Sequence, residues 1–500
     1  MLPTIRQSKS CGTRRARRPQ LRRPTAVAPQ HRLGSATTRG GHVLSRADEN
    51  TYLGHYERKI KQSFDDIVPT LKRISAIQHE PDFEGHAQKI ARDSLGFPMP
   101  EDVLKNAWVD QLDMRRLFAW CVFQVYVRFC DDFYSTAPTG AAEELAGFLQ
   151  SCGFHSLDIS PCADGRLAHV VRYVLRLSPR AVRRKSYAGA LFDVEDSVQK
   201  WVQTELRRYR EGKPNAADSA TRYLKVVVYH FSSSDPEHQG CAAHGSNTEK
   251  AAQAGLEKLV SFREAIENGF CCGASIDLLL IGLDTDTDAI RIHVPNAAGE
   301  IVLERFIESA ELYSKTFDMG RDQALKTIDT AIRVVEPDVA DGMCRLVAKL
   351  IENNISQIDY VKENYGKTYP DIGHAERFVG AGIGFEDIQI RNLMYFSYLD
   401  TVEEGAADLD VGIKIFTGLN VKHGLPVPVV VRFDYHGHIP GGQQRAAQRC
   451  ERVANALAQR YSSLYEKGLL HIMQVVRDCD SNESLQVLMC TAEQDEAGGH

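Results

Sequence analysis

The pattern of hydrophobic and polar positions changes character along the chain. Apolar residues between 110 and 133 recur at helical spacing over a wide face, which predicts a buried helix within a helical region spanning about residues 50–150. Further on, short apolar strands alternate with loops and amphipathic helices. The run LKVVVY at 224–229 is typical of a strand buried on both faces. An amphipathic helix is expected over 249–268, starting from a capping box of Ser246 and Glu249.

The last third of the chain repeats this theme. The pattern predicts a strand at 429–435, a helix at 443–466 and a strand at 469–476. Strand 429–435 ends at His436, as the earlier strand ends at His230, and each is followed by a glycine-containing loop and an alanine-rich helix. This echo hints at a duplication, although a single matched unit is weak evidence. The overall pattern predicts an α/β fold with an N-terminal helical domain.

Composition narrows the class of protein. A chain of 500 residues suggests two to four domains, and 43% hydrophobic with 25% charged residues is ordinary for a soluble globular protein. We find no apolar run near the ~18 residues that a membrane span needs. Twelve cysteines are too few for a disulfide framework, and no apolar signal-peptide core precedes them. We therefore expect reduced thiols that are free to bind a metal.

The net charge of −6 hides a strong asymmetry. Residues 1–46 hold eleven arginines and lysines and no acidic residue, which leaves 49 basic against 66 acidic residues in the rest. This segment has no hydrophobic period, so we expect it to be disordered. A transit peptide or a nucleic-acid arm would share its composition. We favour an electrostatic tether to an acidic protein partner.

Two clusters of residues could support chemistry. The first is DPEHQGCAAH at 235–244, with His230 just upstream at the carboxyl end of the apolar strand. Thiolate and imidazole ligands suit zinc, and open α/β sheets place their sites at such strand ends. Surface histidines around one buried cysteine would give the same pattern.

The second cluster is the motif C-x-D-x-R, formed by Cys162, Asp164 and Arg166. Two cysteines and one histidine would leave a fourth tetrahedral zinc position for water, which is the catalytic arrangement. Asp164 could accept a hydrogen bond from that water, and Arg166 could hold the carboxylate in a bidentate pair. Alternatively, Asp164 could become the fourth ligand and close the site.

At this point the sequence resembles a known family. C-x-D-x-R followed by histidine and cysteine ligands is the β-type carbonic anhydrase pattern. The stretches at 128–138, 232–246 and 266–295 are similar to its divergent carboxysomal shell branch, once called the ε class. The resemblance covers about residues 50–490. It implies a β-carbonic-anhydrase-like catalytic domain and a degenerate second lobe of the same type. The expected division is a disordered extension at 1–48, a helical domain at 49–145, a zinc catalytic domain at 146–385 and the degenerate lobe at 386–500.

The resemblance also implies the site residues. The metal ligands of the family map onto Cys162, His230 and Cys241, and the Asp–Arg pair of the family maps onto Asp164 and Arg166. Ordinary β-type enzymes use a tighter His-x-x-Cys spacing, which His238 and Cys241 would satisfy, so His238 stays open as an alternative ligand. The implied cofactor is Zn²⁺.

The function implied by the resemblance is reversible hydration of CO₂ to bicarbonate by zinc-bound hydroxide. In the carboxysome the useful direction is bicarbonate to CO₂, which supplies Rubisco. The basic extension would tether the enzyme to Rubisco and to shell proteins, and the building block would be a homodimer. We expect no nucleic-acid or membrane partner. The alternative is a non-catalytic carboxysome scaffold with a closed or structural zinc site.

Two other patterns are set aside. The acidic residues of 284–288 lack the glycine and glutamate of a calcium-binding EF-hand loop, so we expect only an acidic turn between strands. Cys271 and Cys272 are adjacent and cannot chelate one ion comfortably. We expect both of these cysteines to be buried.

Overall fold

The computed structural model describes residues 41–108, 110–136, 141–385, 390–399, 402–481 and 483–493. The described chain begins with helices. These are α1 (Ala47–Asp65), α2 (Ile67–Ala76), α3 (Phe83–Ser94), α4 (Glu101–Asn106), α5 (Met114–Thr136) and α6 (Ala141–Ser151). The helix predicted at 110–133 is α5, and the expected helical region is confirmed.

A six-stranded sheet follows, in the order β2-β1-β3-β4-β5-β6. The first four strands in this order run parallel, and β5 and β6 are antiparallel additions. The strands are β1 (Phe154–Pro161), β2 (Arg183–Arg184), β3 (Arg222–Phe231), β4 (Ile276–Asp284), β5 (Ile290–His293) and β6 (Phe306–Glu308). The accompanying helices are α7 (Val194–Arg210), α8 (Thr248–Phe270), α9 (Ser309–Thr316), α10 (Arg321–Val335) and α11 (Asp341–Tyr365).

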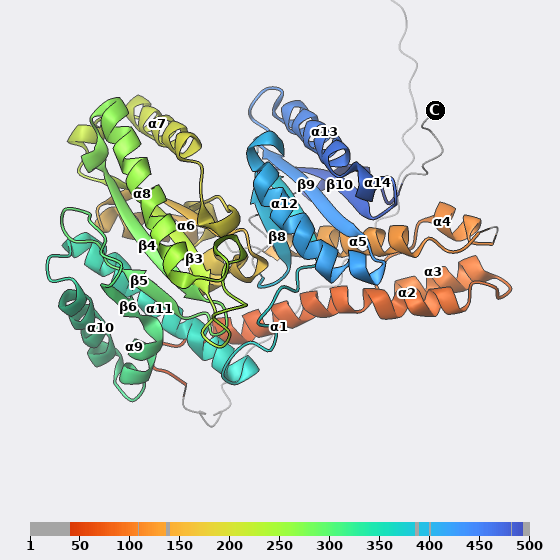
Figure 1. Ribbon diagram of the computed structural model, residues 1–500, viewed down its shortest axis with the longest axis horizontal. Helices are drawn as coiled ribbons and strands as arrows, with labels where there is room; N and C mark the ends of the chain where they lie inside the picture. The colour runs from red at the N-terminus through yellow and green to blue at the C-terminus, as the bar shows by residue number, and fades with distance from the viewer. Residues whose placement is uncertain are drawn as a thin grey trace, which may run out of the picture. The chain divides into compact units, whose positions relative to one another are not determined.

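A second sheet of five strands has the order β8-β7-β9-β10-β11. Its first four strands are parallel and β11 is antiparallel. The elements are β7 (Phe378–Ile383), β8 (Met394–Tyr398), β9 (Val427–Tyr435), β10 (Leu470–Asp478), β11 (Gln486–Cys490), α12 (Val402–Leu419), α13 (Gly442–Arg460) and α14 (Ser462–Tyr465). Figure 1 shows α8 along β3 and β4, and α12 and α13 over β9.

Short helical turns connect these elements. They are η1 (Gly165–Leu167), η2 (Val170–Val174), η3 (Pro179–Ala181), η4 (Ala188–Ala190), η5 (Ala216–Asp218), η6 (Ala242–His244), η7 (Gly273–Ser275) and η8 (Val421–His423). Of these, η1 and η6 directly follow two of the predicted site cysteines.

The two sheets share one topology. The order β8-β7-β9-β10-β11 matches β2-β1-β3-β4-β5, with the same strand directions at every position. The structure is therefore an α/β fold in which a second lobe repeats the arrangement of the first, which confirms the predicted fold class.

Strand register corrects one detail of this comparison. Tyr435 pairs with the last residue of β10, just as Phe231 pairs with the last residue of β4. The position equivalent to His230 is therefore Asp434, and His436 lies two residues further along. The predicted equivalence of His436 with His230 was therefore wrong by two residues, because it aligned the two histidines rather than the ends of the strands.

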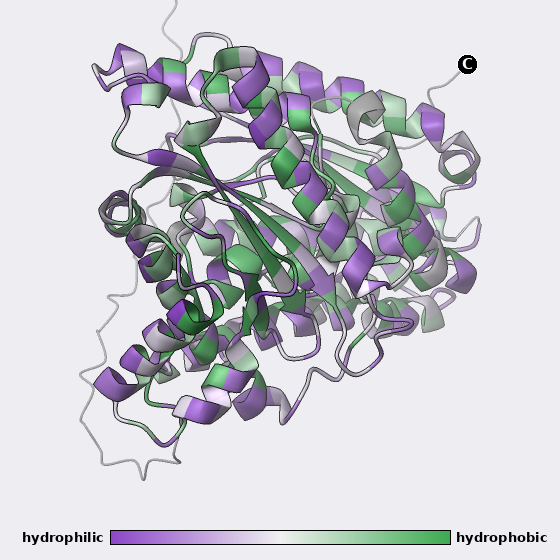
Figure 2. Cartoon of the chain, turned by 60° about the vertical axis from the view of Figure 1, so that its left-hand side comes forward, coloured by the Kyte–Doolittle hydropathy of each residue, from purple (hydrophilic) through white to green (hydrophobic). Residues whose placement is uncertain are grey.

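The core follows the continuous apolar strands. Residues 223–230 of β3 and 427–433 of β9 are buried throughout, and Figure 2 shows the central strands among the most hydrophobic segments. Buried aromatic residues join α5 to the second sheet, for example Tyr126 and Phe378, whose ring centroids lie 5.2 Å apart. Within the described residues, no helix has the length and apolar character needed to cross a membrane.

Helix α8 begins differently from its prediction. Its N-cap is Asn247, whose side chain accepts a hydrogen bond from the backbone N–H of Lys250 at 2.8 Å. Ser246 instead adopts a positive φ of 59° in the preceding turn, so the predicted Ser246–Glu249 capping box is wrong. Cys271 also departs from expectation, because it is exposed at the end of this helix and Cys272 is only partly buried.

Residues 41–48 belong to the folded part, although the sequence analysis assigned them to the basic extension. His42 and Leu44 are buried, and Nε2 of His42 lies 2.9 Å from Oγ1 of Thr316. Arg46 donates to Asn353 at 2.7 Å. Residues 1–40, where the rest of the predicted extension falls, lie outside the described residues.

One charge is buried inside the first sheet. Lys225 is the only charged residue in LKVVVY, and its Nζ lies 3.1 Å from Oδ1 of Asp158 on β1, with both side chains fully buried. It also donates to Ser160 at 2.9 Å, and it lies 4.3 Å from the ring centroid of Phe192. Asp158 and Lys225 are register partners, so the pair ties β1 to β3 within the sheet.

We predict that Lys225→Met lowers the free energy of unfolding by about 3–5 kcal/mol, because it leaves the carboxylate of Asp158 without its closest cation. The double variant Lys225→Met/Asp158→Asn should recover part of this loss. Urea denaturation of Lys225→Met, Asp158→Asn and the double variant measures the coupling. Simple addition of the two single losses in the double variant would contradict a coupled pair.

Candidate metal centre

Parallel pairing of β1 with β3 brings two predicted site residues together. Pro161 pairs with Val228, and the backbone N–H of Cys162 donates to the carbonyl of Val228 at 3.1 Å. Cys162 therefore lies directly after β1, beside His230 near the end of β3. Cys241 arrives from the loop that follows β3, as the residue that caps η6.

The donor atoms of Cys162, His230 and Cys241 all lie within 4.8 Å of one another, and the three residues are at most 5% exposed. The two sulfurs are 4.0 Å apart. Two thiolates on one tetrahedral zinc ion, each at about 2.3 Å, would be about 3.8 Å apart. The spacing in the structure therefore fits zinc with little adjustment.

His230 supplies a second test of fit. It is 1% exposed, yet neither of its ring nitrogens has a hydrogen-bond partner among the described residues. Buried polar atoms normally have partners, and an orphaned imidazole nitrogen beside two thiols is satisfied by a metal ion. The donor set of two sulfurs and one nitrogen is one that zinc prefers.

The electrostatics of the cysteines favour a thiolate at Cys241. A hydrogen bond from the thiol of Cys162 lowers the pKa of Cys241, and the backbone N–H groups of Ala243 and His244 contribute to this shift. These N–H groups belong to the turn η6 that begins at Cys241. A negative sulfur is the form that binds a metal ion.

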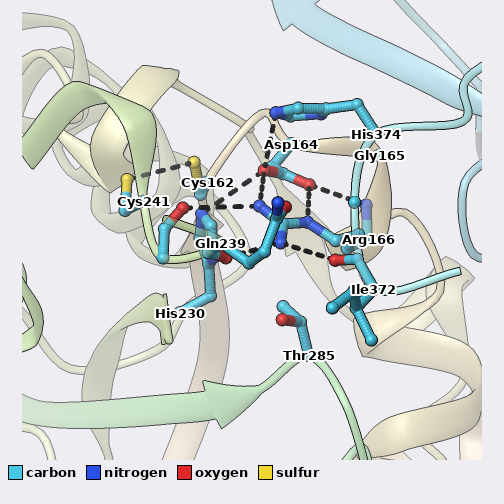
Figure 3. A network of polar contacts seen from close by, with 12 residues as sticks. Cys162, Asp164, Gly165, Arg166, His230, Gln239, Cys241, Thr285, Ile372 and His374 are labelled. Atoms are coloured by element: carbon cyan, nitrogen blue, oxygen red, sulfur yellow. Dashed lines mark hydrogen bonds and ion pairs between the residues drawn. The ribbon is translucent and has the colours of Figure 1, made fainter. Parts of the chain in front are cut away.

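Asp164 and Arg166 form the expected bidentate pair beside these ligands (Figure 3). Nε and Nη2 of Arg166 donate to the two carboxylate oxygens of Asp164 at 2.9 and 2.7 Å. The guanidinium is itself fixed, because Nη1 donates to the carbonyls of Gln239 and Ile372 at 2.6 and 3.0 Å. Both side chains of the pair are buried, and Oδ2 of Asp164 lies 3.6 Å from Nε2 of His230.

Burial alone would raise the pKa of Asp164, but the charges of Arg166, His374 and His230 outweigh burial and hold this pKa well below its ordinary value. The carboxylate therefore stays ionised next to the three candidate ligands. With both oxygens engaged by Arg166, Asp164 is arranged as a hydrogen-bond acceptor rather than as a fourth ligand.

Sequence reasoning missed two residues of this site. Nε2 of His374 lies 3.9 Å from Asp164, and its Nδ1 lies 2.9 Å from Glu376, which also accepts from the backbone N–H of Gly165 at 3.1 Å. Burial opposes protonation of His374, but Asp164 and Glu376 raise its pKa to about 9. These residues come from the connection between α11 and β7, some two hundred positions from Asp164, and no spacing in the sequence links them to the motif.

The other candidate histidines lie away from the three donors. The side chain of His238 is 74% exposed, and its Nδ1 lies 2.9 Å from Asp235. His244 is partly buried, and its Nε2 lies 3.1 Å from the carbonyl oxygen of Gly189. The structure thus groups His230, and not His238, with the two cysteines.

Comparison with known proteins agrees with this geometry. Family models for the carboxysome shell carbonic anhydrase match in three consecutive parts: the N-terminal model over residues 42–134, the catalytic domain over 144–374 and the C-terminal model over 375–492. Cys162, Asp164, Arg166, His230 and Cys241 all fall within the catalytic match.

Relatives named carboxysome shell carbonic anhydrase cover nearly the whole chain. One from Prochlorococcus marinus (strain MIT 9313) is 54% identical over 481 residues, which is 93% of this chain and 94% of the relative. One from Parasynechococcus marenigrum (strain WH8102) is 55% identical over 90% of this chain and 79% of the relative. One from Halothiobacillus neapolitanus is 43% identical over 89% of each. The chain therefore belongs to the carboxysome shell carbonic anhydrase family.

Proposed function

We propose that this carboxysomal carbonic anhydrase holds one zinc ion with Cys162, His230 and Cys241 and uses it for the reversible hydration of CO₂ to bicarbonate and a proton. The observation that supports this most strongly is the buried meeting of two sulfurs with an imidazole that has no hydrogen-bond partner among the described residues. When bound, zinc with three protein ligands keeps an open position and lowers the pKa of a water there to about 7.

The protein side chains orient the reactants. The carboxylate of Asp164 lies within 3.6 Å of His230 and accepts the hydrogen bond of the attacking oxygen, which turns a lone pair of that oxygen toward CO₂. Arg166 keeps Asp164 ionised and fixed in direction, and two backbone carbonyls keep Arg166 in place. Asp164 is thus the catalytic residue of the pair and Arg166 its positioning residue.

The physiological setting extends this proposal. Inside a carboxysome the useful direction is bicarbonate to CO₂, which supplies Rubisco. The acid-free, arginine-rich segment before residue 41 suits a tether to an acidic surface on Rubisco or on shell proteins. We propose a homodimeric building block and a three-part body after an extension that ends at residue 40. The second lobe begins before β7 rather than at residue 386, because β7 pairs with β8 and β9 of the second sheet. The competing function, a scaffold with a closed zinc site, would require Asp164 to leave Arg166 and bind the metal.

We predict that His230→Gln weakens zinc binding by at least about tenfold, because it removes one of three ligands. His238→Gln is the matched control and should retain one zinc ion per chain. Zinc content after dialysis against a chelator, and stopped-flow CO₂ hydration by the reduced protein, report the result. Loss of zinc from the His238 variant instead would contradict the assignment.

Asp164→Asn should lower kcat for CO₂ hydration by about 10- to 100-fold with zinc content unchanged, because the amide cannot accept the hydrogen bond in the same way. Asp235→Asn changes a partly buried carboxylate that lies 2.9 Å from the exposed ring of His238, away from the three donors, and it serves as the control. Parallel loss of zinc and activity in Asp164→Asn would favour the closed-site alternative. Full activity would remove Asp164 from the mechanism.

Deletion of residues 1–40 should leave kcat within about twofold and abolish co-sedimentation with Rubisco. The cut stops at residue 40 because His42, Leu44 and Arg46 pack on the folded body. A full-length variant with the ten basic residues of 1–40 changed to glutamine separates charge from length. Binding that survives this neutralisation would show that charge does not drive the contact.

A further inference from the structure

The end of the second sheet repeats a loop of the first. By strand register, residues 232–234 after β3 correspond to 436–438 after β9. Residues 284–286 at the end of β4 correspond in the same way to 478–480 at the end of β10. Residues 284–286 and 478–480 both have the pattern Asp-x-Asp. The first lies beside the loop after β3, and the second lies beside the loop after β9.

The first aspartate of each pattern accepts the same two backbone hydrogen bonds. Oδ1 of Asp284 accepts the backbone N–H of Ser233 at 3.1 Å, and Oδ1 of Asp478 accepts that of Gly437 at 2.9 Å. Each of these oxygens also accepts the N–H of the second aspartate of its own pattern, at 3.2 and 2.9 Å. The two lobes therefore build one backbone scaffold twice.

The second aspartate differs in its partners. In the first lobe, the hydroxyls of Ser232 and Ser234 donate to Oδ2 of Asp286 at 2.8 and 2.6 Å, and Asp286 is fully buried. These hydroxyls engage Oδ2 only, and Oδ1 of Asp286 is buried without a hydrogen-bond partner among the described residues.

In the second lobe, imidazoles replace both hydroxyls. Nδ1 of His436 lies 2.7 Å from Oδ1 of Asp480, and Nδ1 of His438 lies 2.5 Å from Oδ2. The three side chains are 54%, 71% and 35% exposed, and the two ring centroids are 5.4 Å apart. The loop thus presents two imidazoles and a carboxylate together at the surface.

We propose that His436, His438 and Asp480 bind a divalent transition-metal ion of the Zn²⁺ or Cu²⁺ type. Their donor atoms lie within 4.8 Å of one another, and imidazole nitrogen with carboxylate oxygen is a set that these ions accept. Donors around one tetrahedral ion at about 2.0–2.1 Å are about 3.3 Å apart, so the side chains need to separate by less than about 1 Å. Each imidazole binds the ion through a bare Nδ1, so a neutral ring carries its proton on Nε2 and a doubly protonated ring releases its Nδ1 proton to solvent.

The backbone holds this group in place before any ion arrives. A Cβ at the position of Gly437 would lie 2.2 Å from Oδ2 of Asp478, so a larger residue between the two histidines would displace the carboxylate that holds this loop. The backbone N–H of His438 also donates to Asp480 at 3.2 Å. The remaining coordination positions of the ion face solvent.

This site is distinct from the metal centre of the first lobe. The residue equivalent to His230 is Asp434, whose carboxylate is bound by Arg432 at 2.7 and 2.9 Å. Register through β7 places Ile383 where Cys162 stands in the first lobe. The second lobe therefore lacks the histidine and the cysteine that stand at these two positions in the first lobe. Its own first imidazole, that of His436, lies two residues after Asp434.

The test uses the full-length, reduced protein with one zinc ion already bound at the cysteine site. Equilibrium dialysis against ZnCl₂ should show a second zinc ion per chain. The variant His436→Ser/His438→Ser copies the hydroxyls of the first lobe, so its loop has a proven fold, and it should bind the second ion at least about tenfold more weakly. His238→Gln, which alters an exposed histidine paired with a single carboxylate, should keep the second ion.

Electron paramagnetic resonance with added Cu²⁺ gives an independent readout. The wild-type chain should show coupling to two imidazole nitrogens at one copper equivalent, and the double serine variant should lose it. A wild-type chain that takes up no second zinc ion would overturn the proposal. If the double serine variant bound a second zinc ion as tightly as the wild-type chain, the binding would belong to other surface groups, and the proposal would again be overturned.

Discussion

The parallel pairing of β1 with β3 is the constraint on which the site depends. It fixes Cys162 beside His230 through backbone hydrogen bonds, without help from the side chains themselves. The buried pair of Asp158 and Lys225 joins the same two strands further back along the sheet. Because the strands end together, the loops that leave them converge, and Cys241 and the Asp164 motif reach the same point. The sheet therefore brings the candidate ligands together before any ion is bound.

The two lobes show how burial decides what one backbone arrangement can do. The turn after β4 is covered, so the carboxylate of Asp286 accepts from buried hydroxyls through Oδ2 and is closed off from solvent. The equivalent turn after β10 faces solvent, where exposed imidazoles cost little in desolvation and remain accessible to ions. Conversely, the buried donors of the first lobe are available to a metal ion, because the described residues around His230 give its ring nitrogens no hydrogen-bond partner.

Sequence predicted the parts of this structure whose information is local. Continuous β-branched runs gave the central strands, and C-x-D-x-R placed a carboxylate and its guanidinium two positions apart, which is the pair that forms. The preference for His230 over His238 came from the family resemblance, and the position of His230 at the end of a buried strand supported it. Resemblance to the family added the ligand set, and the metal itself remains a proposal.

Other features depend on tertiary contacts that no local pattern encodes. His374 reaches Asp164 only because the connection after α11 folds back over η1, so its role in the site has no sequence signature. The start of α8 was displaced by one residue because Asn247 competes successfully with Ser246 as the cap. The equivalence of the two lobes needed strand register, since an alignment on histidines shifts it by two positions.

The central claim is the identity of the atoms that hold the catalytic metal. Zinc-edge X-ray absorption on protein containing one zinc ion per chain measures this directly. The account predicts two sulfur neighbours at about 2.3 Å with one imidazole nitrogen and one further light atom at about 2.0–2.1 Å. A first shell of nitrogen and oxygen alone, with no sulfur, would contradict the assignment of Cys162 and Cys241 as ligands.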